Sequence, residues 1–166
     1  MEFCKHIKFD DKDRKDNNYN NNQTMSGRGG NAVEPTATLA VTKTVTCTPN
    51  DTLQPAVVAC QIILSSVLPS SFNIVVTGNN PNPSEFAGSS VPVDVSLGAG
   101  DYEVTEEAPF VPPPAGAGIT LTTNFSGACT DVNPNNPQST EATGTIEAGE
   151  SQICNISNDY RTFTLT

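Results

Sequence analysis

The sequence predicts an all-β protein, an antiparallel sandwich of about seven strands that follows a polar N-terminal tail. Threonine, valine, serine and asparagine dominate the composition, which lacks the bias toward helix formers that a helical bundle needs. In addition, 13 prolines and 12 glycines separate short apolar runs at regular intervals. Such spacing of short strands and turns is typical of a β-sandwich.

The first three elements are placed by their apolar patterns. A strand is expected at residues 37–47, where apolar side chains alternate with threonines. The run at 57–65 is a short, mostly apolar one, so it fits either a buried strand or one turn of helix. A further strand is expected at 71–77, where the turn residues 78–83 end it.

The four remaining strands lie between clear turn signals. These signals are the glycine turn at 98–101, the prolines at 112–114 and the Asn/Pro-rich segment at 133–137. The strands are expected at residues 91–97, 101–107, 118–124 and 151–160.

Composition divides the chain into three parts. Residues 1–36 are polar and Asn-rich, which predicts an arm that is flexible alone or ordered between subunits. Residues 37–160 hold the sandwich. Residues 161–166 alternate again, with Phe163 and Leu165 on one face, and form a C-terminal strand, a continuation of the last strand or a linker stub.

Charge restricts the partners of the folded part. Residues 31–166 carry thirteen acidic side chains and only two basic ones, Lys43 and Arg161. Phosphate groups are bound by clustered Lys and Arg, so we expect no binding to nucleic acid or anionic lipid. No apolar run is long enough to cross a bilayer.

Cysteine usage predicts an extracellular or cell-surface location. Five cysteines occur without a Cys-x-x-Cys pair or nearby histidines, so disulfides are expected rather than a metal site. The expected pairs are Cys47 with Cys60 and Cys129 with Cys154; buried free thiols are the alternative. Cys4 is left over.

Other sequence signals for export are weak. No hydrophobic stretch near the first residue resembles a signal peptide. Asn50, Asn124 and Asn155 begin sequons and are candidates for N-glycosylation, although Asn-rich and Thr-rich sequence also generates this motif by chance.

Lys43 is the most informative residue, because it is the only lysine in residues 31–166 and lies within an apolar strand face. With a period of two, it shares its face with Leu39, Val41 and Val45. A buried ammonium is costly, so it either deprotonates or finds a carboxylate. The same phase places Glu106 on an apolar face of 101–107, and Asn158 on one of 151–160.

Four segments resemble the prealbumin-like, immunoglobulin-like sandwich domains of the Cna protein B-type and SpaA-like kind, found in bacterial and archaeal surface proteins. They are the opening strand with its lysine at 39–45, the core strand at 71–78, the glycine turn with tyrosine and glutamate at 97–106, and the closing strand at 144–159. The insertion that holds Cys47 and Cys60 departs from the family's usual link after the first strand.

The resemblance implies an autocatalytic isopeptide bond. Lys43 would be the nucleophile, Asn158 the acceptor and Glu106 the assisting acid. Such chemistry needs a dry site, in which burial favours the neutral amine. Two alternatives stay open: a simple Lys43–Glu106 ion pair with Asn158 hydrogen-bonded nearby, and Glu107 in place of Glu106 if the strand is bulged.

The function expected from these features is structural. We expect a subunit or module of an extracellular filament or pilus-like appendage, without cofactors or bound metal, that self-associates by strand exchange through the N-terminal arm or the C-terminal strand. The alternative is an adhesin that binds a glycan or host protein through its Asn/Pro-rich loops at 78–86 and 131–140.

Two further site types are expected to be absent. An enzyme acting on an external substrate is not expected, because His6 in the tail is the only histidine and no serine has a base to activate it. Residues 131–135 alternate oxygen ligands like a calcium loop, but the required glycine and glutamate are missing, which favours an ordinary turn.

Overall fold

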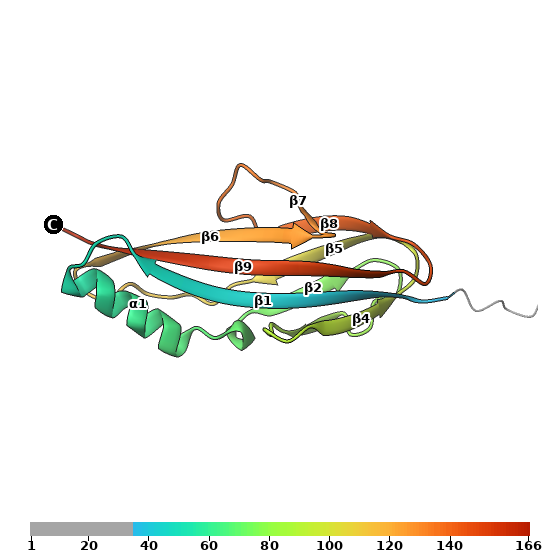
Figure 1. The fold of residues 1–166 in the computed structure, drawn as a ribbon, viewed down its shortest axis with the longest axis horizontal. Helices are drawn as coiled ribbons and strands as arrows, with labels where there is room; N and C mark the ends of the chain where they lie inside the picture. The colour runs from blue at the N-terminus through green and yellow to red at the C-terminus, as the bar shows by residue number, and fades with distance from the viewer. Residues whose placement is uncertain (1–34) are drawn as a thin grey trace, which may run out of the picture. The chain divides into compact units, whose positions relative to one another are not determined.

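The structure, a computed structural model, describes residues 35–166 and confirms the all-β sandwich (Figure 1). One sheet has the strand order β4 (Val93–Leu97), β1 (Ala37–Pro49), β9 (Ser151–Thr164) and β6 (Ala117–Gly127). The other has the order β3 (Glu85–Ala87), β2 (Asn73–Thr77), β5 (Gly100–Glu107), β8 (Glu141–Ile146) and β7 (Thr130–Asp131). Of the predicted N-terminal arm, residues 1–34 lie outside the described residues.

The first and last strands lie side by side at the centre of the four-stranded sheet and run parallel. All the other strand pairs are antiparallel, as expected for the whole sandwich. The parallel register places Lys43 opposite Ile156 and Val45 opposite Asn158. Lys43 and Asn158 are therefore diagonal neighbours on adjacent strands.

The core lies between the two sheets and follows the predicted alternation. On β1, Leu39, Val41 and Lys43 are fully or almost fully buried. Strand β5 contributes Tyr102, Val104 and Glu106 in the same way, which confirms the period-two pattern of both strands. The inner faces of the remaining strands supply Ile74, Val76, Val95, Leu97, Ala142, Ile146, Cys154, Ile156, Asn158 and Tyr160.

The strand alternative for 57–65 is wrong, because these residues belong to the helix α1 (Gln54–Ser66). Its buried residues Ala56, Ala59, Cys60 and Ile63 recur at helical spacing and form one face. A proline in the first turn supports helix initiation, since its missing N–H has no intrahelical partner there. The β-branched residues of the run concealed this period in the sequence.

Three short strands were missed by the sequence analysis. They are β3, β7 and β8, of which β7 has two residues and β3 three. β8 contains alanine, glycine and threonine where strands are usually recognised by large β-branched residues. Gly144 is required within it because the Tyr102 ring occupies the space of a Cβ.

Residues 161–164 continue the last strand. They pair with β6 on one side, and Arg161 and Thr162 pair with β1 on the other. Arg161 and Thr162 are therefore paired on both sides and have no free edge. The strand exchange that was expected at the C-terminal strand cannot occur at these two residues. Within residues 35–166, no helix is long and apolar enough to cross a membrane.

The helical assignment of α1 predicts different roles for two neighbouring isoleucines. Ile63 is fully buried, whereas Ile62 is 45% exposed. We expect Ile63→Ala to lower the free energy of unfolding by about 2–5 kcal/mol, and Ile62→Ala by less than about 0.5 kcal/mol. Urea denaturation measures both values, and equal losses would contradict the packing of this helix.

Candidate cross-linking site

Three polar side chains meet in the core between the sheets. Lys43 comes from β1, Glu106 from β5 and Asn158 from β9, and they are 0%, 2% and 0% exposed. Lys43 Nζ lies 2.5 Å from Glu106 Oε2. Asn158 Nδ2 donates a hydrogen bond to Glu106 Oε1 at 2.6 Å. The structure thus brings together all three residues that the sequence placed in this site.

Phe72 and Gly88 complete the surroundings of the lysine. The Lys43 ammonium lies 4.3 Å from the centroid of the Phe72 ring, within cation–π range. A Cβ on Gly88 would come within 2.5 Å of the Pro69 carbonyl oxygen and 2.9 Å of Lys43 Cγ, so glycine leaves room for the backbone and for the lysine stem. Sequence analysis missed both residues, because neither strand periodicity nor turn chemistry indicates which residues pack against a given side chain.

Burial dominates the electrostatics of the amine. Desolvation lowers the pKa of Lys43 from 10.5 to about 8, although the charge and hydrogen bond of Glu106 act in the opposite direction. At neutral pH the neutral, nucleophilic form of the amine is therefore far more populated here than at an ordinary surface lysine.

Glu106 bridges two nitrogen atoms. One carboxylate oxygen contacts Lys43 Nζ and the other contacts Asn158 Nδ2. The glutamate is thus positioned to take a proton from the amine and deliver it to the amide nitrogen. Asn158 Oδ1 is buried and has no hydrogen-bond partner within the described part of the chain. Glu106 therefore contacts the amide nitrogen of Asn158 and not its carbonyl oxygen.

The alternative acid is placed elsewhere. Glu107 is exposed, and its carboxylate accepts a hydrogen bond from Asn73 Nδ2 at 3.2 Å. The register of β5 with β2 is regular through Glu107, opposite Asn73. Glu106 is therefore the carboxylate of this site, and the bulged alternative is wrong.

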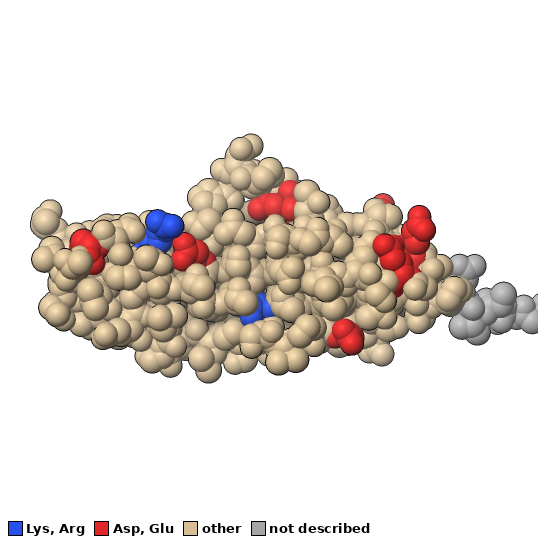
Figure 2. Space-filling model, viewed as in Figure 1, with Lys and Arg blue, Asp and Glu red and all other residues tan. Residues whose placement is uncertain are grey.

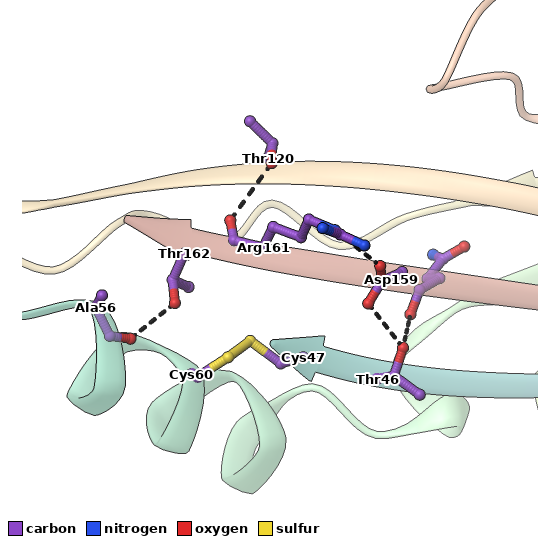
Figure 3. The surroundings of a disulfide bond; sticks show 9 residues. Thr46, Cys47, Ala56, Cys60, Thr120, Asp159, Arg161 and Thr162 are labelled. Carbon is purple, nitrogen blue, oxygen red and sulfur yellow. Dashed lines mark hydrogen bonds and ion pairs between the residues drawn. A yellow bond between two sulfur atoms is a disulfide. The ribbon is translucent and has the colours of Figure 1, made fainter. Parts of the chain in front are cut away.

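Both predicted disulfides are present. Cys47, on β1, is bonded to Cys60 on α1, with a Cα–Cα distance of 5.6 Å (Figure 3). Cys129, just before β7, is bonded to Cys154 on β9, with a Cα–Cα distance of 5.2 Å. Both strands that carry the lysine and asparagine are thereby tied covalently to other elements. Disulfides of this kind are compatible with an extracellular protein.

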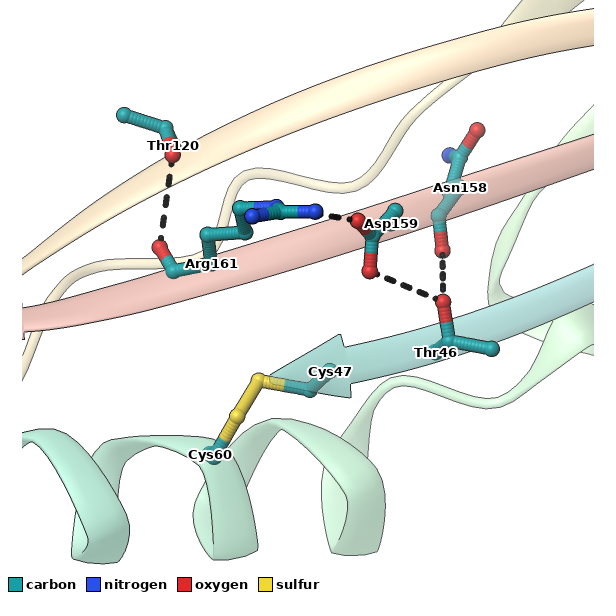
Figure 4. Close-up of polar contacts among 7 residues, drawn as sticks. All are labelled: Thr46, Cys47, Cys60, Thr120, Asn158, Asp159 and Arg161. Atoms are coloured by element: carbon teal, nitrogen blue, oxygen red, sulfur yellow. Dashed lines mark hydrogen bonds and ion pairs between the residues drawn. A yellow bond between two sulfur atoms is a disulfide. The ribbon is translucent and has the colours of Figure 1, made fainter. Parts of the chain in front are cut away.

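Polar contacts also join β1 and β9 on the outer face of their sheet (Figure 4). Thr46 Oγ1 donates to a carboxylate oxygen of Asp159 at 3.0 Å and lies 3.5 Å from the backbone oxygen of Asn158. Asp159 also accepts from Arg161 Nε at 3.2 Å. These exposed contacts add little free energy individually, yet they support the same register.

The remaining candidate residues lie on the surface. Asn50, Asn124 and Asn155 are all exposed, and their glycosylation stays a prediction. Asp131 Oδ1 accepts hydrogen bonds from the Asn133 backbone and from Ser139 Oγ, as in an ordinary turn. His6 and Cys4 lie outside the described residues.

Comparison of the chain with protein-family models, with curated proteins and with solved structures finds no match.

The low pKa of Lys43 predicts a pH dependence of stability in a variant that cannot cross-link. Asn158→Leu removes the acceptor but keeps the volume. Between pH 8 and 10.5 the unfolded state then holds the lysine proton that the folded state has released. Stability therefore rises with pH through this window, by on the order of 3 kcal/mol.

Urea denaturation of Asn158→Leu, compared with Asn158→Leu/Lys43→Met, isolates the contribution of Lys43. NMR titration of the Lys43 side chain should give a midpoint near 8. A midpoint near 10.5 together with a pH-independent difference between the two variants would contradict the dry environment.

Proposed function

We propose that this protein is an extracellular structural protein, a subunit or module of a surface filament, whose sandwich is closed by an isopeptide bond between Lys43 and Asn158. The observation that carries the proposal is the buried contact of Lys43, Glu106 and Asn158 between the first and last strands. A salt bridge alone is a weak source of stability at a buried position, because desolvation offsets much of the attraction.

The reaction balances without a cofactor. Glu106 takes a proton from the Lys43 ammonium, and the neutral Nζ attacks Asn158 Cγ. The Nζ–Cγ bond forms and the Cγ–Nδ2 bond breaks, while Glu106 passes one proton from Nζ to the departing nitrogen, which leaves as ammonia. The second proton that Nζ loses stays on Glu106, so the product holds a neutral carboxyl group. The hydrogen bond that Glu106 accepts from Nδ2 supports this route.

Strand direction supports a load-bearing role. Because β1 and β9 are parallel, the start of β1 and the end of β9 lie at opposite ends of the sandwich (Figure 1). Tension applied through these ends pulls the two strands past each other. A bond between Lys43 and Asn158 would carry that force directly from β1 to β9, and residues 44–157 would then be bypassed.

The domain is strongly acidic, so two copies would repel each other wherever their carboxylates meet. Self-association would therefore require a surface that carries no carboxylates. No charged residue occurs between Asp51 and Glu85. The outer side of α1 exposes Val58 and Ile62, and Leu68 follows it at 52% exposure. Figure 2 shows no charged side chain over this helix, at the lower left of the view. This face is our candidate contact between subunits.

The cross-link predicts a mass and a stability difference. Purified, reduced wild-type protein should lack one ammonia relative to its sequence, and the cross-linked peptide should contain Lys43 and Asn158. By limiting the unfolded ensemble, the bond should add about 4–5 kcal/mol to the free energy of unfolding relative to Asn158→Leu. Intact-mass spectrometry and guanidinium denaturation measure the two effects.

Two control variants sharpen this test. Glu106→Gln keeps the shape of the acid but cannot relay protons, so its mass should be that of the unreacted chain. Glu107→Gln changes the neighbouring exposed carboxylate and should retain the wild-type mass loss. An unshifted wild-type mass would reduce the site to an ion pair and refute the proposed bond.

If subunits meet at the outer side of α1, a charge placed there should prevent assembly. Ile62→Glu places a charge on the outer side of the helix, so it should prevent self-association while leaving the folded domain intact. Val91→Glu changes a residue that is 70% exposed outside this surface and serves as the control. Light scattering and electron microscopy should show loss of assemblies only for Ile62→Glu; a wild-type protein that stays monomeric would contradict the filament proposal.

A hollow on the surface supports the adhesin alternative at the loop 131–140, one of the two loops expected to bind a ligand. A depression of about 310 Å³ lies beside the turn after β7 and is lined by Phe125, Asp131, Asn135 and Asn136 among others. Amide and carboxylate groups beside an aromatic ring suit a carbohydrate. A glycan array should show binding that Asn136→Ala abolishes; an array without hits would remove this alternative.

A further inference from the structure

Two buried polar atoms on β9 have no hydrogen-bond partner among residues 35–166. They are Asn158 Oδ1 and the hydroxyl oxygen of Tyr160, and both side chains are at least 98% buried. One atom is an acceptor without a donor, and the other carries a donor without an acceptor. Unpartnered buried polar groups are rare and costly, so a pair of them beside a reactive site requires a reason.

The two side chains start from the same face of one strand. Asn158 and Tyr160 are two residues apart on β9, and both point to its inner face. Burial, and then the negative charge of Glu106, raise the pKa of Tyr160. The phenol is therefore neutral at physiological pH and lies within the electrostatic reach of the carboxylate that contacts Lys43 and Asn158.

The reaction described above lacks one component. When Nζ attacks Asn158 Cγ, negative charge develops on Oδ1, and a donor at this position would lower the barrier. Both oxygens of Glu106 are already engaged with nitrogen atoms. Glu106 thus serves the nucleophile and the leaving group, and the oxyanion needs another donor.

We propose that the Tyr160 hydroxyl donates a hydrogen bond to Asn158 Oδ1 as the tetrahedral intermediate forms. The inference rests on the proposed isopeptide bond. In the structure, the hydroxyl hydrogen-bonds neither Oδ1 nor any other acceptor of residues 35–166. Catalytic hydrogen bonds often tighten only as the reaction proceeds, and a donor that engages only then lowers the barrier without stabilising the reactant.

Tyr102 provides a matched control. It is as buried as Tyr160, but its hydroxyl is already engaged, with the Ala128 carbonyl at 3.2 Å and Gln152 Oε1 at 3.1 Å. Tyr102 therefore has a structural hydrogen-bonding role that Tyr160 lacks. Removing each hydroxyl separately should distinguish a hydroxyl that stabilises the fold from one that accelerates the reaction.

The experiment follows bond formation during folding. Full-length protein recovered unfolded from inclusion bodies is refolded in a glutathione redox buffer, quenched in acid at intervals, reduced and weighed by mass spectrometry. We expect Tyr160→Phe to lose ammonia about 10²-fold more slowly than the wild type. Tyr102→Phe should react at the wild-type rate.

Two further measurements separate a reactive from a structural role. In the Lys43→Met background, which cannot cross-link, adding Tyr160→Phe should raise the denaturation midpoint slightly, because it removes an unpartnered buried hydroxyl. Adding Tyr102→Phe should lower the midpoint, because it removes a hydroxyl that is hydrogen-bonded. Replacing Tyr160 by 3-fluorotyrosine, a more acidic phenol and a stronger donor, should accelerate the reaction. Packing of the ring alone predicts no such acceleration.

The outcomes distinguish this inference from the proposed function. A wild-type protein that never loses ammonia overturns the isopeptide bond and the role of Tyr160 with it. A wild-type protein that reacts, with Tyr160→Phe at the same rate, overturns only the role of Tyr160.

Discussion

Burial of the Lys43 ammonium is the constraint on which the centre of this sandwich depends. An amine in a dry core needs a carboxylate, and Glu106 on the opposite sheet supplies it at 2.5 Å. Removing one member of such a pair leaves an uncompensated buried charge, which costs about 3–5 kcal/mol. The contact therefore connects the two sheets at one defined position along the core.

The parallel pairing of β1 and β9 brings the group that would react with the lysine next to it. It places an amide acceptor on the strand adjacent to the lysine, on the same inner face. The carboxylate reaches both nitrogen atoms from the other sheet. The amine, the amide and the carboxylate are thereby held together by three strands, which is the preorganised arrangement that the proposed reaction would require.

The covalent and non-covalent connections act on the same two strands. The Cys47 disulfide holds the end of β1 to α1, and the Cys154 disulfide holds β9 to the segment before β7. An isopeptide bond between β1 and β9 would join the strands to each other. The protein would then resist separation of its first and last strands by covalent bonds rather than by packing alone, as a load-bearing extracellular module requires.

Much of the fold and the three principal residues of the site could be predicted from the sequence. The period of two placed Lys43, Glu106 and Asn158 on core-facing positions, and the turn residues separated most of the strands correctly, because both signals are local. Tertiary structure decided the rest. Helical packing overrode the β-branched residues at 57–65, while the Gly88 and Phe72 contacts and the choice of Glu106 over Glu107 depend on segments distant in sequence. The unpartnered hydroxyl of Tyr160 is likewise invisible in the sequence, because the absence of a hydrogen-bond partner is a property of the surrounding core.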